Sequence, residues 1–277
     1  MAIATPMRDA MAARLRQLVG SGELDLTRPP GDPGLIAPGS PAWAVHGDFA
    51  AMMIGGISAL LLQMLHPGAL AGVWDHSDFR HDRLRRLRRT AQFIAVTTFG
   101  ATAAAEQAIA HVRAIHDRVH GTLPDGTAYD ANDPALLTWI HVAEVDSFLR
   151  AYLRYRDPAL GGGEQDRYLA DVAIVAERLG ARDVPRSRAE VAAYFARVRP
   201  QLRGDHRVRA VADALLAPGE DAAEAAGLSL ASAAAVDLLP DWAAAMHRRR
   251  PPRLARPAIR AGAGGMSRVV RWALRRA

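Results

Sequence analysis

The spacing of apolar residues predicts helices along almost the whole chain. Apolar positions recur every three or four residues, which is the period of one face of an α-helix. No window of sufficient length alternates apolar and polar residues with the β-branched enrichment that strands require. The expected helices occupy about 47–65, 83–104, 105–120, 133–155, 164–180, 187–199, 205–216, 229–247 and 267–276. The pattern predicts an all-α protein.

Clusters of glycine and proline separate these helices and indicate one domain with two flanking segments. A short helix and an irregular lead-in rich in proline and glycine are expected over 1–42. A single multi-helix globular domain follows over 43–250, and its helix at 133–155 opens with Asp133 before a proline, a typical helix start. The remaining segment, 251–277, is expected to be a detachable tail rich in arginine.

The most apolar stretch runs from Phe49 to Leu65, close to the lower length limit of a membrane-spanning helix, about 17 to 25 residues. It contains two adjacent glycines, Ser58 and Gln63, and it stops at His66-Pro67. Polar side chains and a proline boundary are more typical of a core helix. We therefore expect this segment to lie inside the domain rather than in a bilayer.

Composition excludes several classes of chemistry. The 277 residues include no cysteine, which excludes disulfides, iron–sulfur clusters, and cysteine-ligated zinc or haem. All 35 basic residues are arginine, so Schiff-base and pyridoxal-phosphate chemistry, which need lysine, are excluded as well. Any metal must be held by histidine, carboxylate, tyrosine or methionine. A chain of this length buries roughly three quarters of its surface on folding, enough to enclose a large ligand.

The net charge of +6 is unevenly distributed along the chain. The segment 247–277 contains ten arginines and no acidic residue, so it carries +10, while the first 246 residues sum to −4. Its last helix interleaves arginines with apolar residues such as Val269 and Trp272, and it could contact a membrane surface peripherally. A solvated tail is the alternative interpretation. No nucleic-acid-binding motif accompanies these arginines, so we expect no nucleic-acid partner.

Histidines are the strongest candidates for ligating a metal, and the helical pattern separates them. His116 shares a helix face with Ile109, Val112 and other apolar residues, where a neutral imidazole needs a hydrogen-bond partner or a metal. A core histidine satisfied by hydrogen bonds is the alternative. His120 follows at the expected helix end, where a histidine often only stabilises the terminus. A non-haem site built on both lacks a local pair of carboxylates.

A second group of candidates lies on the expected helix at 83–104. Beside its apolar stripe runs a wall that consists of Arg86, Arg89, Thr90, Phe93 and Thr97. Guanidinium and hydroxyl groups beside an aromatic ring could hold propionates or position a polar oxidant. A solvated, arginine-rich face is the alternative. His141, with Glu144 and Asp146 downstream, is an alternative ligand or a residue that supports one.

Several short motifs occur in an order that is similar to a known family. They are Leu62-Gln63-Met64-Leu65-His66-Pro67, Ala71-Gly72-Val73, His76-Ser77, Arg83-Leu84, Arg89-Thr90, His116-Asp117-Arg118-Val119-His120-Gly121, Gly126-Thr127-Ala128-Tyr129-Asp130-Ala131, Trp139-Ile140-His141 and Leu238-Leu239-Pro240-Asp241-Trp242. Over roughly residues 43–250 the chain resembles the MpaB-type oxygenases, a family that includes the rubber oxygenases called latex clearing proteins.

The resemblance implies an all-helical domain that encloses haem b (iron protoporphyrin IX) and carries a histidine axial ligand. By position, His116 is the expected metal ligand, with His120 and His141 as alternatives. Arg86, Arg89 and Thr90 match the segment on the distal side of the haem, where they would act as catalytic residues. The expected cofactor-binding set is completed by Arg86, Phe93 and His66.

The function implied is a haem b-dependent oxidoreductase, an oxygenase or a peroxidase-like enzyme, that uses dioxygen or peroxide on a hydrophobic small molecule. A non-catalytic haem-binding or sensing protein and an unliganded helical interaction protein are the alternatives. Latex clearing proteins have a lysine before the matching threonine that can cap the iron, whereas this chain has Arg89. A guanidinium stays protonated and is a poor iron ligand, so a substrate other than rubber is expected.

Two further expectations concern location. The first 19 residues carry arginines among alanines and lack the continuous apolar run of a signal peptide. Together with the absence of cysteine, this favours a cytoplasmic protein, with peripheral membrane contact through the basic segment as the exception. The oligomeric state is not indicated by any of these features.

Overall fold

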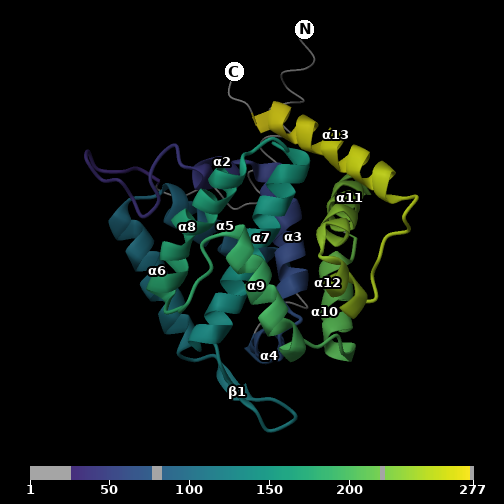
Figure 1. Ribbon diagram of the computed structural model, residues 1–277, viewed down its shortest axis with the longest axis horizontal. Coiled ribbons are helices and arrows are strands. Elements are labelled where there is room, and N and C mark those ends of the chain that lie inside the picture. Colours follow the sequence, from purple (N-terminus) through teal and green to yellow (C-terminus); the bar gives the residue numbers. More distant parts are fainter. Residues whose placement is uncertain (1–25, 77–82, 219–221, 275–277) are drawn as a thin grey trace.

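The computed structural model describes residues 26–76, 83–218 and 222–274, and it confirms a single all-α domain (Figure 1). The expected N-terminal helix, from Met1 to Val19, lies outside these residues. The helices are α2 (Pro41–Gly47), α3 (Phe49–Gln63), α4 (Pro67–His76), α5 (Arg83–Phe99), α6 (Thr102–His116), α7 (Pro134–Tyr155), α8 (Gly162–Leu179), α9 (Arg188–Val198), α10 (His206–Leu216), α11 (Ala222–Leu238), α12 (Asp241–Met246) and α13 (Arg256–Leu274). A short 3₁₀ turn (Arg199–Gln201) follows α9.

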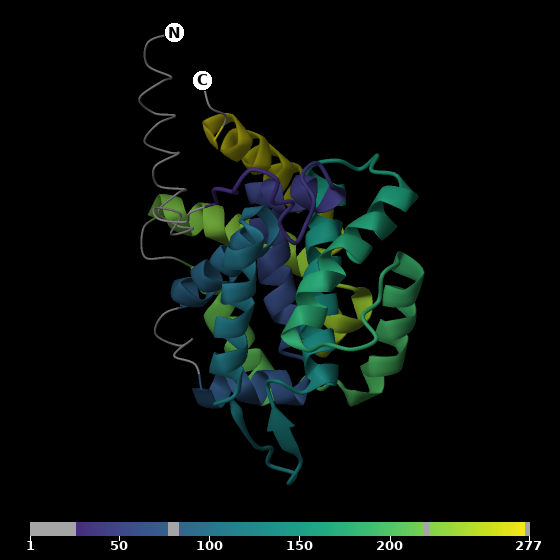
Figure 2. The same cartoon turned by 90° about the vertical axis from the view of Figure 1, so that its left-hand side faces the viewer.

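Helices α3 and α7 pack against each other at the centre of the domain, and the other helices surround them (Figures 1 and 2). Ten of the fifteen residues of α3 are buried, as expected for a core helix. The side chain of Gln63 donates a hydrogen bond to the carbonyl of Ile140 at 3.1 Å, and the indole of Trp139 donates to the carbonyl of Gln63 at 3.0 Å. These bonds satisfy polar groups at the C-terminal end of α3, where the helix leaves carbonyls unpaired.

The helix expected over 47–65 is α3, and it is preceded by a short helix, α2, that was not predicted. Asp48 has an extended backbone between α2 and α3, and its carboxylate accepts a hydrogen bond from the amide of Ala51 at 2.9 Å, which caps the start of α3. No single helix among the described residues is long and apolar enough to cross a membrane, and α2 with α3 pass that test only as a pair bent by 86°. The prolines and glycines before residue 43 led to the prediction of an irregular lead-in, which is why α2 was missed.

Other boundaries also differ from the sequence prediction. The segment Pro67–His76 forms α4, which was not predicted, and Pro240 divides the helix expected over 229–247 into α11 and α12. The expectation that no strands form was wrong at one place. Strands β1 (His120–Thr122) and β2 (Ala128–Asp130) pair in antiparallel register, with His120 opposite Asp130. Strands of three residues are too short to produce a visible alternation.

The two-stranded hairpin is fixed to α4 by one tyrosine. The hydroxyl of Tyr129 donates to the carboxylate of Asp75 at 2.9 Å and lies 3.2 Å from the Nε2 atom of His76. Burial and the neighbouring carboxylate raise the pKa of Tyr129 to about 12, so the phenol remains a donor at neutral pH. The hairpin therefore has a defined position at the end of the domain where α6 ends and α7 begins (Figure 1).

The basic segment after residue 250 lies against the domain. Most of it forms α13, which starts at Arg256 instead of near residue 267 and packs against α11, α3 and α7. The fully buried side chain of Asp237 accepts hydrogen bonds from Arg154 and Arg260, and Arg256 lies 3.4 Å from it. At the other end, Arg271 binds the carboxylate of Asp48 at 3.2 Å. The detachable tail expected from the sequence is thus attached through three of its arginines.

Two adjacent glycines of α3, Gly55 and Gly56, differ in how closely they approach α7. A β-carbon at Gly55 would lie 3.0 Å from the Ser147 carbonyl oxygen and 2.9 Å from the Phe148 ring, whereas one at Gly56 would lie 3.9 Å from its nearest neighbour. We expect Gly55→Ala to lower the free energy of unfolding by about 1–3 kcal/mol, because α7 backbone must move. Gly56→Ala should be neutral or raise it by up to about 1 kcal/mol, because alanine favours helix.

Urea unfolding followed by far-ultraviolet circular dichroism measures both values under the same conditions. Equal effects of the two alanines would contradict the close approach of α3 and α7 at Gly55.

Candidate functional site

Helices α5 and α6 carry five of the candidate site residues named from the sequence, Arg86, Arg89, Thr90, Phe93 and His116. They are joined by Gly100 and Ala101 and pack side by side (Figure 2). On α5, Arg89 is exposed, while Thr90 and Phe93 are partly buried. The backbone of Arg86 belongs to α5, but its side chain lies outside the part that the structure describes. Among the described residues, no hydrogen bond connects Arg89 or Thr90 with a predicted histidine, so the structure does not join these two groups.

His116 is the last residue of α6 and is partly buried. Its Nδ1 atom is shielded from solvent and has no hydrogen-bond partner. Burial lowers the pKa of His116, and the neighbouring side chains of Asn132, Asp130 and Asp117 partly oppose this shift. The imidazole is therefore neutral near pH 7 and keeps a free ring nitrogen, the state in which histidine can ligate a metal.

The other predicted histidines have different surroundings. His120 is the first residue of β1 and is exposed, so it does not share the environment of His116. The Nδ1 atom of His66 accepts a hydrogen bond from the amide of Gly68 at 3.2 Å, which fixes the turn that leads into α4. Burial lowers the pKa of His66, and its ring lies 6.2 Å from that of Trp139. The bond to Gly68 gives His66 a structural role in this turn.

His141 lies on α7 inside the domain and is only 9% exposed. Its Nε2 atom is buried without a hydrogen-bond partner, and burial lowers the pKa of His141 to about 4. Two of the three histidines that the sequence proposed as ligands, His116 and His141, thus have a buried and unpaired ring nitrogen. An unpaired polar atom inside a protein costs free energy and calls for an explanation such as a ligand.

The sequence missed a group of buried polar side chains next to His141. This inner polar cluster consists of His46 on α2, Thr98 on α5, His141 and Glu144 on α7, and Tyr168 on α8. The Nδ1 atom of His46 lies 2.8 Å from the Thr98 hydroxyl, and its Nε2 atom lies 3.1 Å from the Tyr168 hydroxyl. One imidazole therefore links three helices through both ring nitrogens.

Burial shifts the pKa values of the inner polar cluster toward the uncharged forms. Burial and the nearby His141 lower the pKa of His46 to about 3, and burial raises the pKa of Glu144 to about 7. Burial, together with the charges of Glu144 and Asp146, raises the pKa of Tyr168 well above its usual value. The sequence indicates His141 with Glu144 downstream, but its pattern gives no sign that His46, Thr98 and Tyr168 join them.

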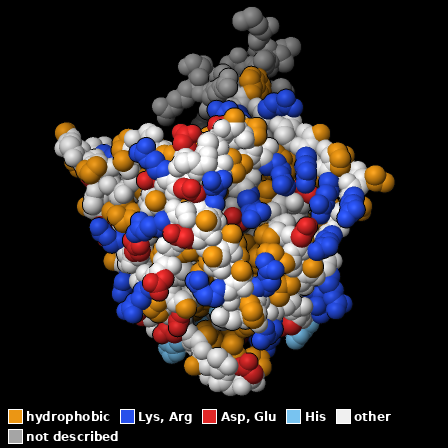
Figure 3. Space-filling view, viewed as in Figure 1, with side chains coloured by type: hydrophobic (Ala, Val, Ile, Leu, Met, Phe, Trp, Pro, Cys, Tyr) orange, Lys and Arg blue, Asp and Glu red, His pale blue; other side chains and the backbone are white. Residues whose placement is uncertain are grey.

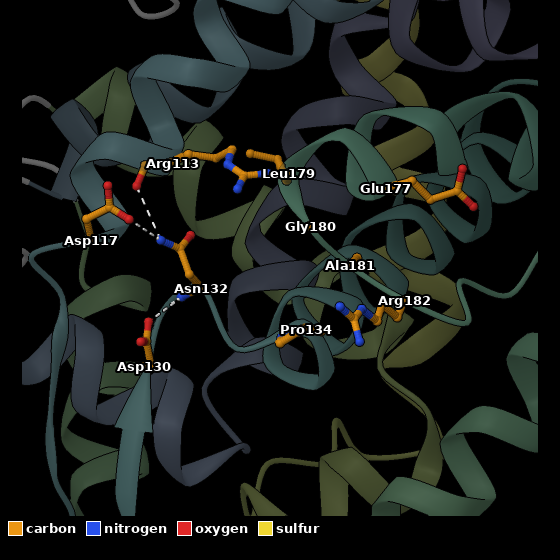
Figure 4. A pocket seen from close by; sticks show the side chains of 10 residues that line it. All are labelled: Arg113, Asp117, Asp130, Asn132, Pro134, Glu177, Leu179, Gly180, Ala181 and Arg182. Carbon is orange, nitrogen blue, oxygen red and sulfur yellow. Dashed lines mark hydrogen bonds between the residues drawn. The ribbon is translucent and has the colours of Figure 1, made fainter.

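A pocket of about 610 Å³ is lined in part by Asp117, Asp130 and Asn132, the side chains that interact with His116 (Figure 4). Asn132 lies in it between Asp117 and Asp130. Its side-chain amide donates to Asp117 at 2.7 Å and its backbone amide donates to Asp130 at 2.7 Å. Arginines, carboxylates and this amide line the pocket, whereas sites for large apolar ligands are mostly hydrophobic. The pocket suits a small polar molecule, so a porphyrin that binds His116 would have to lie outside it.

No group of three or more histidine, aspartate or glutamate side chains in the described part of the chain could hold a metal ion. A metal bound directly by several side chains therefore has no support within those residues. A single unpaired imidazole, as at His116 or His141, suits a metal whose other ligands come from a cofactor.

Comparison with known proteins identifies a family. Residues 43–275 match the family described as ER-bound oxygenase mpaB/B'/rubber oxygenase, catalytic domain. No curated protein and no solved structure matches the chain. The match begins at residue 43 and continues through α13, so the basic helix lies within the matched length.

The inner polar cluster makes the stability of the domain dependent on pH. Unfolded histidines take up protons below about pH 6.5, whereas the pKa values near 3 and 4 keep folded His46 and His141 neutral. Their contribution to stability is thus complete above pH 6.5 and is lost as the pH falls toward 4. Each contributes a slope of about 1.4 kcal/mol per pH unit in this range. The raised pKa of Glu144 acts in the opposite direction, because its contribution is lost as the pH rises from 4.5 through 7.

We expect the variant His46→Gln to lose one histidine slope. Between pH 5 and 6 its free energy of unfolding should vary by about 1.4 kcal/mol per pH unit less than that of the unchanged protein. Urea unfolding at a series of pH values measures this difference. The exposed His111 provides the control, since His111→Gln should keep the original slope. A slope of His46→Gln equal to that of the unchanged protein would show that His46 is not a buried neutral imidazole.

Proposed function

The chain belongs to the ER-bound oxygenase mpaB/B'/rubber oxygenase catalytic-domain family, and we propose that it is a haem b-dependent oxidoreductase acting on a hydrophobic small molecule. The family description supports oxygenase chemistry. The lack of cysteine excludes a thiolate ligand, and the family resemblance favours histidine as the protein ligand for haem iron. The reaction would use dioxygen or peroxide as the oxidant.

The observation that carries the haem proposal is the unpaired ring nitrogen of His116. This nitrogen is buried on a neutral imidazole and makes no hydrogen bond of good geometry, although the side chain of Asn132 interacts with the ring. Such an atom would be suited to bind haem iron, and Asn132, Asp117 and Asp130 beside the ring would hold its orientation and tune its basicity. His141 has the same property at its Nε2 atom and is the alternative ligand. The haem, once bound, would supply the redox chemistry of the reaction.

The polar residues of α5 would contact the oxidant and the haem propionates. Thr90, which is partly buried, is suited to donate a hydrogen bond to the oxidant. Arg89 is exposed, and we assign it to a haem propionate, since a guanidinium binds carboxylates at a solvent-facing edge. Arg86 is proposed for the same purpose on the family resemblance alone. Phe93, which is partly buried on the same helix, would contact the cofactor through its ring.

The proposed substrate follows from the family description and from one residue, Arg89, at which this chain differs from the latex clearing proteins. Rubber oxygenases are named in the family description, which favours a hydrophobic substrate. Arg89 occupies the position of the lysine that resemblance to latex clearing proteins leads us to expect. A guanidinium does not release its proton near neutral pH, so it cannot bind iron as an amine can. We therefore propose a small hydrophobic molecule in place of rubber.

Absorption spectroscopy of the protein, produced with a haem precursor in the medium, tests the haem proposal. We expect a Soret band in the unchanged protein and its loss, or a reduction to about a tenth, in His116→Ala. The exposed His120 gives a matched control, because His120→Ala should retain the band. Far-ultraviolet circular dichroism verifies that each variant is folded.

The outcomes separate the alternatives. Retention of the band in His116→Ala together with its loss in His141→Ala would move the axial ligand to α7. A folded protein without any Soret band would contradict haem binding as a whole. Bound haem without consumption of dioxygen or peroxide in the presence of hydrophobic reductants would indicate a haem-binding protein that is not an enzyme.

A further inference from the structure

The outer face of α13 exposes apolar side chains to solvent. Among the described residues, four large hydrophobic side chains are exposed, and three of them lie on this segment. Leu254, in the turn before α13, is 94% exposed, Val269 is 48% exposed and Trp272 is 41% exposed. Val269 and Trp272 are three residues apart and share one side of the helix. Ala258 and Ala261, between them and Leu254, are exposed as well.

The opposite face of the same helix is fixed to the domain. Ala263 and Ser267 are completely buried, and Arg260 and Arg271 bind the carboxylates of Asp237 and Asp48. Helix α13 therefore differs from an ordinary surface helix. Its inner face is packed against the domain, and its outer face also carries exposed apolar side chains. An exposed apolar surface of this kind often marks an interaction site.

The charge around this face is strongly positive. No acidic residue follows Asp241 in the sequence, whereas ten arginines do. Arg253 and Arg268 are exposed and have no ion-pair partner among the described residues. The space-filling view shows arginine side chains gathered over α13 and the segment that leads into it (Figure 3). A partner must therefore be negatively charged and must also accept apolar side chains.

We propose that the outer face of α13 binds the surface of an anionic lipid bilayer. Leu254, Val269 and Trp272 would enter the boundary between headgroups and acyl chains, where tryptophan is favoured. Arg253 and Arg268 would pair with lipid phosphates beside them. Nucleic acid has phosphates but offers nothing that favours an exposed leucine and valine, so the apolar half of this surface selects the bilayer.

The proposed surface also has a suitable shape. A helix of 19 residues is about 28 Å long, so its outer face can lie along a membrane plane over its full length. Because the inner face is held by Asp237 and Asp48, the helix is presented without unfolding any part of the domain. The proposal does not depend on haem or on the oxidative reaction.

Sedimentation of the full chain with lipid vesicles tests the proposal. We expect binding to vesicles of 70% phosphatidylcholine and 30% phosphatidylglycerol in about 0.1 M salt, and binding at least about tenfold weaker to pure phosphatidylcholine. The double variant Arg253→Gln/Arg268→Gln should weaken binding by about 30-fold, from the contribution of two arginines near an anionic surface. Leu254→Asp, at a side chain without core contacts, should weaken it further.

A matched control keeps the same change in charge. Arg167 and Arg182 are exposed on another part of the domain, so Arg167→Gln/Arg182→Gln should reduce binding less than threefold. Tryptophan fluorescence gives a second measurement, because Trp272 should shift its emission to the blue when anionic vesicles are added. This shift should be absent in Trp272→Phe, since Trp139 is completely buried and the other tryptophans are not exposed.

Several outcomes would overturn the proposal. These are no sedimentation with anionic vesicles, equal binding to neutral and anionic vesicles, or equal losses in the two arginine double variants. Tighter binding to a 20-base-pair DNA duplex, with displacement of vesicles by that DNA, would assign the surface to nucleic acid instead.

Discussion

The close packing of α3 against α7 is the constraint on which the rest of the domain depends. Gly55 allows the two helices to approach until only a hydrogen atom fits between it and the backbone of Ser147 and Phe148. Gln63 and Trp139 then join the ends of the two helices by reciprocal hydrogen bonds. This contact fixes the rotation of α7 about its axis. It therefore determines where His141 and Glu144 lie.

The interior of this domain is neither purely apolar nor strongly charged. It holds imidazoles and a glutamate whose pKa values burial shifts toward the neutral forms, together with hydroxyl groups that pair with them. Where a full charge is buried it is paired, as at Asp237, which is surrounded by arginines from α7 and α13. Neutral histidines with unpaired nitrogens are the groups that can accept a metal without disturbing this balance.

Helix α13 shows how one segment can serve both stability and interaction. Its arginines divide into those that bind the domain, such as Arg260 and Arg271, and those that face solvent, such as Arg268. The ten arginines at the end of the chain suggested a detachable tail because the sequence does not show that Asp48 and Asp237 lie beneath them. The buried carboxylates come from segments that are distant along the chain, and only folding brings them to α13.

The sequence by itself determined the helical fold, the exclusion of cysteine and lysine chemistry, and the family, because periodicity, composition and ordered motifs are local properties of the chain. It also placed His116 on an apolar face. Tertiary structure decided the bend at Asp48, the hairpin, the link from His46 to Thr98 and Tyr168, and the exposure of His120. It also decided which ring nitrogens of His116 and His141 stay unpaired. Each of these depends on contacts between residues far apart in the chain, and the pattern of one segment contains no information about its partner.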